Sequence, residues 1–241
     1  MSRLQRLLAS LVLCSSVGGS TLGCGSREDG RVERREEAPA PKVDTARAGA
    51  PDSRAPRVVI LGDSLTAGLG IAVDEAYPAL IERRLREHGL KYRVVNAGVS
   101  GDTSAGGLSR LDWALDGDVR VLVVALGGND ALRGLPVEEL GRNLARIIQR
   151  AQARGITVIL AGMEAPPNFG QEYTKAFHAV YPALAKQYRV ALVPFLLEGV
   201  AGNDALNQRD HMHPNAQGAQ VVADNVWAVL KPTLQGRLAH D

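Results

Sequence analysis

The sequence predicts an α/β domain whose sheet is parallel and doubly wound, with about five strands and with helices on both faces. From Arg57 onward, short apolar runs alternate regularly with amphipathic stretches. These runs are nearly continuous in apolar residues, which is typical of parallel strands that are buried on both faces. Most of the runs are followed by a polar, glycine-containing stretch, as expected where ligands bind at the carboxyl edge of such a sheet.

The expected strands follow from the apolar runs taken in order. The first run has three β-branched residues among its four and stops at Gly62, and the third run is the longest. Such short runs bounded by glycine and polar residues indicate buried strands. The five strands are expected at 58–61, 92–95, 119–126, 156–160 and 190–193.

The expected helices lie between and after these strands. Leucines at 108, 111 and 115 recur at helical spacing, and so do the apolar residues between Leu140 and Ile148, in a helix stopped by Gly155. Pro214 is expected in the first turn of the last helix, because proline suits that position. The helices are therefore expected around 79–85, 108–115, 140–155, 173–188 and 214–230.

The amino-terminal segment predicts export. Residues 1–23 have a basic start, a short apolar core and a small-residue exit, as in a secretory signal peptide. Residues 24–56 are rich in charge and proline without an apolar period, so we expect a disordered linker before the domain at 57–236.

Cys24 has two interpretations. The stretch Thr21-Leu22-Gly23-Cys24 resembles a bacterial lipobox, in which the cysteine is lipidated and becomes the first residue. A lipid anchor on Cys24 would tie the protein to a membrane. The alternative is an ordinary cleaved signal with a chance cysteine. Both interpretations predict an exported protein of the periplasm or cell envelope.

Composition argues against a nucleic-acid partner. Lysine and arginine number 28 against 26 acidic residues, and aromatic residues make up 4% of the chain. A nucleic-acid binder normally carries a basic excess, and single-strand binding uses aromatic stacking platforms. We expect no nucleic-acid partner and a monomer.

The stretch Gly62-Asp63-Ser64-Leu65 carries the first chemical signal. A buried strand ends abruptly there at a hydroxyl group, so Ser64 is a candidate nucleophile. The alternative is a strand-to-helix turn in which the serine only caps the next element.

Three further polar stretches decide between these interpretations: 96–102 (Asn-Ala-Gly-Val-Ser-Gly-Asp), 127–130 (Gly-Gly-Asn-Asp) and 210–214 (Asp-His-Met-His-Pro). Together with the first, they resemble the four sequence blocks of the SGNH hydrolase superfamily, the GDSL esterases and lipases, over nearly all of residues 57–235. Arg133-Gly134, 167–170 and Tyr181-Pro182 also resemble its periplasmic thioesterase/lysophospholipase and arylesterase branch. The resemblance implies a three-layer α/β/α sandwich with a flavodoxin-like sheet.

The resemblance also implies a role for each block. Ser64 would attack the carbonyl, His213 would take and return the proton, and Asp210 would hold the imidazole. The oxyanion hole would consist of the backbone N–H groups of Ser64 and Gly98 and the side-chain amide of Asn129. The family needs no cofactor and no metal.

Other interpretations of these residues are structural. Asn129 could serve as a loop or cap residue, His213 could cap the last helix and Asp210 could be a surface acid. His211 and His213 near an acid suggest zinc, but no third ligand cluster is evident in the sequence.

Residues after the third and fourth strands are candidates for binding the acyl group. The loop 131–136 resembles the mobile substrate loop of the thioesterase branch, and apolar residues after the fourth strand could form a wall. Simple loop packing is the alternative. The candidates are Leu132, Leu135, Pro166, Phe169 and Tyr173.

The sequence thus predicts a serine esterase that hydrolyses carboxylic esters and thioesters through an acyl-enzyme on Ser64. Aryl esters and short to medium acyl esters are the expected substrates, and lysophospholipid and acyl-CoA are further candidates. A carbohydrate O-acetylesterase and a non-catalytic envelope lipoprotein of the same fold are the alternatives.

Overall fold

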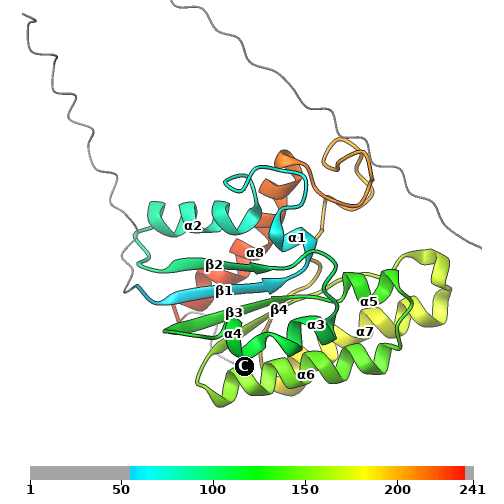
Figure 1. Ribbon diagram of the computed structural model, residues 1–241, viewed down its shortest axis with the longest axis horizontal. Coiled ribbons are helices and arrows are strands. Elements are labelled where there is room, and N and C mark those ends of the chain that lie inside the picture. Colours follow the sequence, from blue (N-terminus) through cyan, green and yellow to red (C-terminus); the bar gives the residue numbers. More distant parts are fainter. Residues whose placement is uncertain (1–54, 237–241) are drawn as a thin grey trace, which may run out of the picture. The chain divides into compact units, whose positions relative to one another are not determined.

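The computed structural model describes residues 55–236, and these form a five-stranded parallel sheet between two layers of helices (Figure 1). The strands lie in the order β2-β1-β3-β4-β5. The predicted doubly wound α/β fold is therefore confirmed, with strand ends shifted by at most three residues. The strands are β1 (Arg57–Gly62), β2 (Arg93–Gly98), β3 (Val119–Ala125), β4 (Thr157–Ala161) and β5 (Ala191–Val193).

The helices divide between the two faces of the sheet (Figure 1). One face carries α2 (Tyr77–Glu87) and α8 (Ala216–Leu234), which pack against each other. The opposite face carries α3 (Ser104–Ser109), α4 (Leu111–Ala114), α6 (Val137–Ala153) and α7 (Gln171–Tyr188). Three short helical turns follow strand ends: α1 (Ser64–Ala67), α5 (Gly128–Leu132) and η1 (Pro167–Phe169).

The strand order places the switch point of the sheet between β1 and β3. The chain leaves β1 towards β2 on one side and leaves β3 towards β4 on the other. These two central strands end level with each other, since Gly62 pairs with Ala125. In open α/β sheets ligands bind at the carboxyl ends of the strands that flank this point. The segments after Gly62 and Ala125 therefore emerge together.

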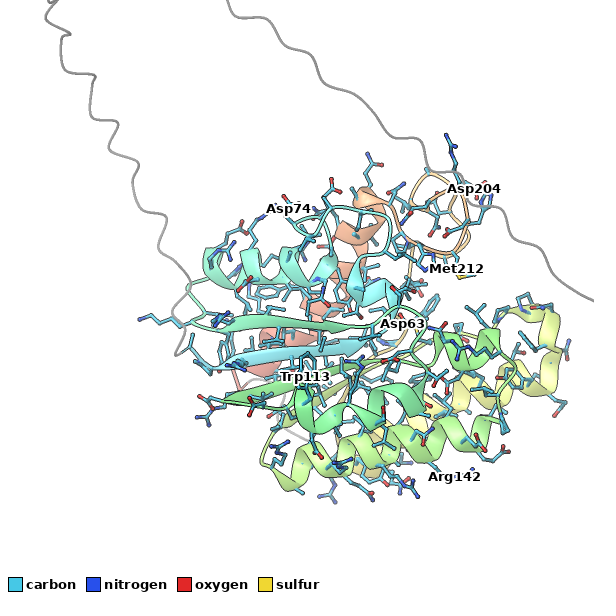
Figure 2. The ribbon with its side chains drawn as sticks, viewed as in Figure 1. Asp63, Asp74, Trp113, Arg142, Asp204 and Met212 are labelled. Atoms are coloured by element: carbon cyan, nitrogen blue, oxygen red, sulfur yellow. The ribbon has the colours of Figure 1, made fainter. Side chains whose placement is uncertain are left out.

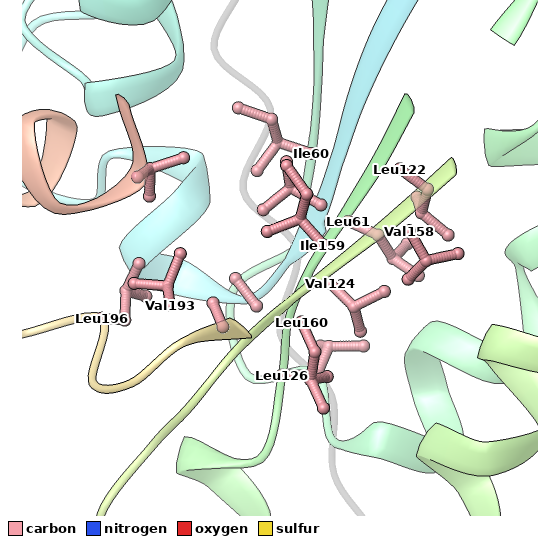
Figure 3. Close-up of a cluster of buried hydrophobic side chains, with 14 of the residues drawn as sticks. Ile60, Leu61, Leu122, Val124, Leu126, Val158, Ile159, Leu160, Val193 and Leu196 are labelled. Atoms are coloured by element: carbon pink, nitrogen blue, oxygen red, sulfur yellow. The ribbon is translucent and has the colours of Figure 1, made fainter. Parts of the chain in front are cut away.

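Alternation along the central strands fills the core on both faces. Figure 3 shows Ile60 and Ile159 on one side of the sheet and Leu61 and Val158 on the other. All four side chains are almost completely buried. Successive side chains of a strand point to opposite faces of the sheet. An apolar residue at every position therefore suits a sheet that is covered by helices on both faces.

Two expected helices differ from the sequence prediction. The last helix begins at Ala216, and the prediction that Pro214 lies in its first turn is wrong. The Asn215 side chain accepts hydrogen bonds from the N–H groups of Gln217 and Gly218 and so acts as the N-cap. The stretch expected as one helix over 108–115 forms α3 and α4, with Arg110 between them in a non-helical conformation.

The predicted signal peptide, the linker and Cys24 lie outside the described residues, apart from the last two linker positions. Within residues 55–236, no helix combines the length and apolar character that crossing a bilayer requires.

Candidate active site

Ser64 lies at the carboxyl end of β1, where the chain turns from strand to helix. It is the first residue of α1, and Asp63 is the N-cap, with its Oδ1 accepting from the Leu65 N–H at 3.0 Å. This cap fixes the turn, so that the Ser64 hydroxyl projects from the edge of the sheet. The first N–H groups of a helix have no partner within the helix, so the Ser64 N–H is available to a ligand.

The loop before α8 supplies an imidazole with a carboxylate behind it. Asp210 Oδ1 accepts from the N–H groups of Met212 and His213, both at 3.0 Å. Asp210 Oδ2 accepts from His213 Nδ1 at 2.6 Å. The backbone N–H of His213, its imidazole and the N–H of Met212 hold the pKa of Asp210 well below its usual range. An ionised carboxylate only accepts, so Nδ1 carries the proton and Nε2 of the neutral ring keeps a lone pair.

This lone pair faces the serine. Ser64 Oγ lies 2.9 Å from His213 Nε2, although 149 residues separate them in the chain. The His213 side chain is 14% exposed and that of Asp210 is 48% exposed, so the imidazole is sheltered while the carboxylate borders solvent. A hydroxyl, an imidazole and a carboxylate in this geometry are those of a serine nucleophile with its general base and the group that orients the base.

The structure does not place Gly98 at this site, and its expected role as an oxyanion donor needs correction. Gly98 belongs to β2, and its N–H donates to Asn96 Oδ1 at 2.9 Å. A Cβ at this position would lie 2.3 Å from the backbone N of Ala67. The glycine therefore permits close packing of β2 against α1, and its N–H already has a partner.

Gly101 lies three residues further on in the same sequence block. It lines the cavity beside Ser64, and no hydrogen bond of its N–H is found among the described residues. Its φ of 84° lies in the region that favours glycine, and its carbonyl accepts from Arg133 Nη2 at 2.7 Å. Gly101 follows the strand, whereas Gly98 lies within it. The sequence prediction ended this strand at residue 95 and so placed both glycines after it, and no local signal separated them.

Asn129 reaches the same place from α5. Its Nδ2 donates to Asp63 Oδ2 at 3.2 Å, which leaves the second hydrogen of the amide free. The neighbouring Asp130 is buried and accepts from both the N–H and the hydroxyl of Ser104 at 2.8 and 2.5 Å. Asn143 of α6 donates to that hydroxyl at 3.0 Å, so hydrogen bonds link α5 to Ser104 of α3 and, through its hydroxyl, to α6.

Asp63 is a buried acid within this site. The residue is 3% exposed, and burial raises the pKa of Asp63 to about 6. The Leu65 N–H, the nearby His213 and the Asn129 amide act in the opposite direction and stabilise the ionised form.

A cavity of about 310 Å³ opens beside Ser64 and His213. Figure 2 shows Asp63 at the carboxyl end of β1 and Met212 on the loop that precedes α8, and both residues line this cavity. The wall is mostly apolar, with polar groups gathered around the serine. It consists of Asp63, Ser64, Leu65, Leu69, Ser100, Gly101, Gly128, Asn129, Leu132, Met163, Glu164, Pro166, Leu197, Met212 and His213.

The structure divides the five residues that were expected to bind the acyl group. Leu132 and Pro166 line the cavity, whereas Leu135, Phe169 and Tyr173 do not. The Tyr173 hydroxyl donates to the Leu135 carbonyl at 2.9 Å, and its ring centroid lies 5.3 Å from that of Phe169. These three therefore brace the loop between α5 and α6.

Several wall residues have no signal in the sequence. Met163 and Leu197 follow the ends of β4 and β5, and nothing in their local pattern separates them from core residues. Met212 lies within the block 210–214, but the sequence pattern indicated no role for this side chain. Glu164 also lines the cavity, and its carboxylate pairs with His178 Nδ1.

His211, considered above as a metal ligand, pairs with Asp204 through its Nδ1 at 2.8 Å. Residues 55–236 contain no group of three or more His, Cys, Asp or Glu side chains placed to hold a metal ion.

Comparison with known proteins gives the same assignment as the geometry. Residues 60–221 match the GDSL-like Lipase/Acylhydrolase family. Esterase TesA of Pseudomonas aeruginosa is 47% identical over 178 residues, which cover 73% of this chain and 89% of that protein. Thioesterase 1/protease 1/lysophospholipase L1 of Escherichia coli is 39% identical over 189 residues, covering 78% and 88%. A crystal structure of TesA superposes with a TM-score of 0.71 at 46% identity, covering 73% of this chain and 98% of that one. The chain belongs to the GDSL-like lipase/acylhydrolase family, the SGNH hydrolases.

Proposed function

We propose that this protein is an exported serine esterase that hydrolyses carboxylic esters and thioesters through an acyl-enzyme on Ser64. The observation that carries the proposal is the continuous chain of contacts from Asp210 through His213 to Ser64 Oγ, which opens onto a mostly apolar cavity. The similar proteins named esterase, arylesterase and thioesterase/lysophospholipase support the same substrate classes.

In the proposed reaction, His213 Nε2 removes the hydroxyl proton as Ser64 Oγ attacks the carbonyl carbon. The negative charge on the carbonyl oxygen is stabilised by the N–H groups of Ser64 and Gly101 and by the Asn129 amide. His213 then donates its proton to the departing alcohol or thiol. A water molecule, activated by the same imidazole, releases the acid and restores the serine.

The cavity wall favours an acyl chain over a sugar. Seven of its residues are apolar, among them Leu132, Met163 and Leu197. A sugar ring would bring several hydroxyl groups against these apolar side chains, and the hydroxyl groups would then lack hydrogen-bond partners. Aryl and short to medium acyl esters are therefore preferred to acetylated carbohydrate, with lysophospholipid and acyl-CoA as candidates for the natural substrate.

The test is hydrolysis of p-nitrophenyl acetate, butyrate and octanoate by the purified mature protein. Ser64→Ala is expected to lower kcat by about five to six orders of magnitude. Ser109→Ala, which changes an exposed serine on α3, is expected to retain full activity. Full activity in Ser64→Ala would refute the nucleophile assignment. Absence of turnover in the wild type on these esters, on acyl-CoA and on lysophospholipid would favour a non-catalytic lipoprotein. Turnover of acetylated xylan alone would favour the carbohydrate esterase.

The proposal extends to the amino terminus. Residues 1–23 would direct export, Cys24 would carry a lipid, and residues 24–56 would tether the domain at 57–236 to the membrane. Mass spectrometry of the mature amino terminus tests this proposal. A first residue other than Cys24, or an unmodified Cys24, would remove the lipid anchor.

A further inference from the structure

One buried carboxylate in the site has no part in the proton relay. Asp63 lines the cavity next to the nucleophile, and Figure 2 shows it at the carboxyl end of β1. A buried acid is costly to ionise, so its retention beside a reacting serine calls for a physical reason. The relay from Asp210 to Ser64 needs no second carboxylate.

The two oxygens of Asp63 bind groups on different elements. Oδ1 accepts from the Leu65 N–H and caps α1, whereas Oδ2 accepts from Asn129 Nδ2 of α5. Asp63 and Asn129 are 66 residues apart in the chain. The carboxylate therefore joins the turn that carries the nucleophile to the side chain that would stabilise the oxyanion.

The contact with Asn129 has a chemical consequence. A primary amide has a donor side and an acceptor side, and rotation by half a turn about its last bond exchanges them. With the NH₂ group towards Asp63, one hydrogen binds Oδ2 and the other is left for the cavity. In the opposite orientation the amide oxygen would face the developing oxyanion and repel it. An ionised carboxylate accepts but never donates, so it selects the first orientation.

We propose that Asp63 is a positioning residue that fixes the orientation of the Asn129 amide, so that Asn129 donates a hydrogen bond to the oxyanion. This inference rests on the proposed function, in which Asn129 is one of the oxyanion donors. Asp63 acts through Asn129 and does not touch the substrate's reacting atoms. The cap on α1 is a separate, structural contribution of the same side chain.

Asp63→Asn separates the two contributions. The new side chain keeps an oxygen for the Leu65 N–H but turns an NH₂ group towards Asn129, where a donor would meet a donor. Asn129 is then expected to rotate and present its oxygen to the introduced amide, which directs the wrong side of the Asn129 side chain at the oxyanion. Asp63→Ser is the second variant, because serine also caps helices but is too short to reach Asn129.

The experiment is a double-mutant cycle measured with p-nitrophenyl butyrate on wild type, D63N, N129A and D63N/N129A. N129A is expected to lower kcat by about 10²–10³-fold, the cost of one lost oxyanion donor, and D63N by about 10–10²-fold. KM should change little in either, since the donor acts mainly in the transition state. The double variant should be no slower than N129A, because residues that act through one another are not additive.

Each other outcome has a defined meaning. If the D63N and N129A effects multiply, Asp63 acts independently of Asn129 and the inference is overturned. D63N or D63S with wild-type kcat, while N129A is impaired, also overturns it. If N129A itself keeps wild-type kcat, the oxyanion role of Asn129 in the proposed function fails, which the single variant reveals by itself. D74N, at an exposed acid on the loop before α2 (Figure 2), is the control and is expected to match wild type.

Discussion

The burial of Asp63 predicts that this residue makes the protein less stable at neutral pH. The pKa of Asp63 rises from its ordinary value of 3.8 to about 6 in the folded protein, chiefly because the carboxyl group is buried. Between these values the unfolded chain releases the proton while the folded chain retains it. The stability contribution of the protonated acid is therefore complete below about pH 4 and is lost as the pH rises through 6.

The magnitude follows from the two pKa values. A difference from 3.8 to about 6 corresponds to about 3 kcal/mol of unfolding free energy. Asp63→Asn is nearly isosteric with the protonated acid and does not titrate, so it is expected to be more stable than wild type by up to about 3 kcal/mol at pH 7.5. For a domain of this size each kcal/mol raises Tm by about 2–4 °C. Asp63→Asn is thus expected to raise the free energy of unfolding while it lowers kcat, which is the usual trade-off between stability and activity at an active site.

The assay is urea unfolding followed by circular dichroism between pH 4 and 8. Wild type, D63N and the exposed-acid control D74N are compared at each pH. The advantage of D63N over wild type should be largest above pH 6 and should shrink towards pH 4, whereas D74N should follow wild type throughout. A D63N protein that is less stable than wild type at pH 7.5, or an advantage that does not depend on pH, would refute the reasoning.

Two further predictions concern the relay and the cavity. Asp210→Asn should lower kcat by about 10⁴-fold, because Nδ1 of His213 loses the acceptor that fixes its tautomer. Asp204→Asn, in the same loop and beside a different histidine, should leave kcat unchanged, and equal losses in the two variants would contradict the assignment. Leu132→Trp should narrow the cavity, and excluding two methylenes would lower kcat/KM for an octanoyl ester by roughly 15-fold at about 0.8 kcal/mol each. Hydrolysis of the acetate ester by this variant should be retained. Val73→Trp, at an exposed surface position, serves as the control. An unchanged ratio of octanoate to acetate hydrolysis in Leu132→Trp would show that the acyl chain binds elsewhere.

Local sequence pattern determined the architecture and the location of the chemistry. Continuous β-branched runs such as Val58–Leu61 identified buried parallel strands, because only a sheet covered on both faces favours them. The end of each run then indicated where the polar groups would emerge. Ser64 and Asn129 follow the first and third strands and were indicated in this way, because the carboxyl edge of a parallel sheet gathers such groups. The role of His213, which lies 20 residues after the end of β5, was implied instead by the resemblance to the SGNH hydrolases.

The tertiary structure alone decided which neighbouring groups enter the site. Gly98 and Gly101 occur in one short block, but only the register of β2 with β1 shows that Gly98 is held in the sheet while Gly101 reaches the cavity. Likewise, Leu135 and Tyr173 are occupied in bracing a loop, and Met212 comes from a segment with no regular period. The bond from Asp63 to Asn129 joins residues 66 positions apart. Sequence periodicity reports which face of an element is buried, whereas these contacts depend on how separate elements meet, and that is fixed only when the whole sheet and its loops are packed.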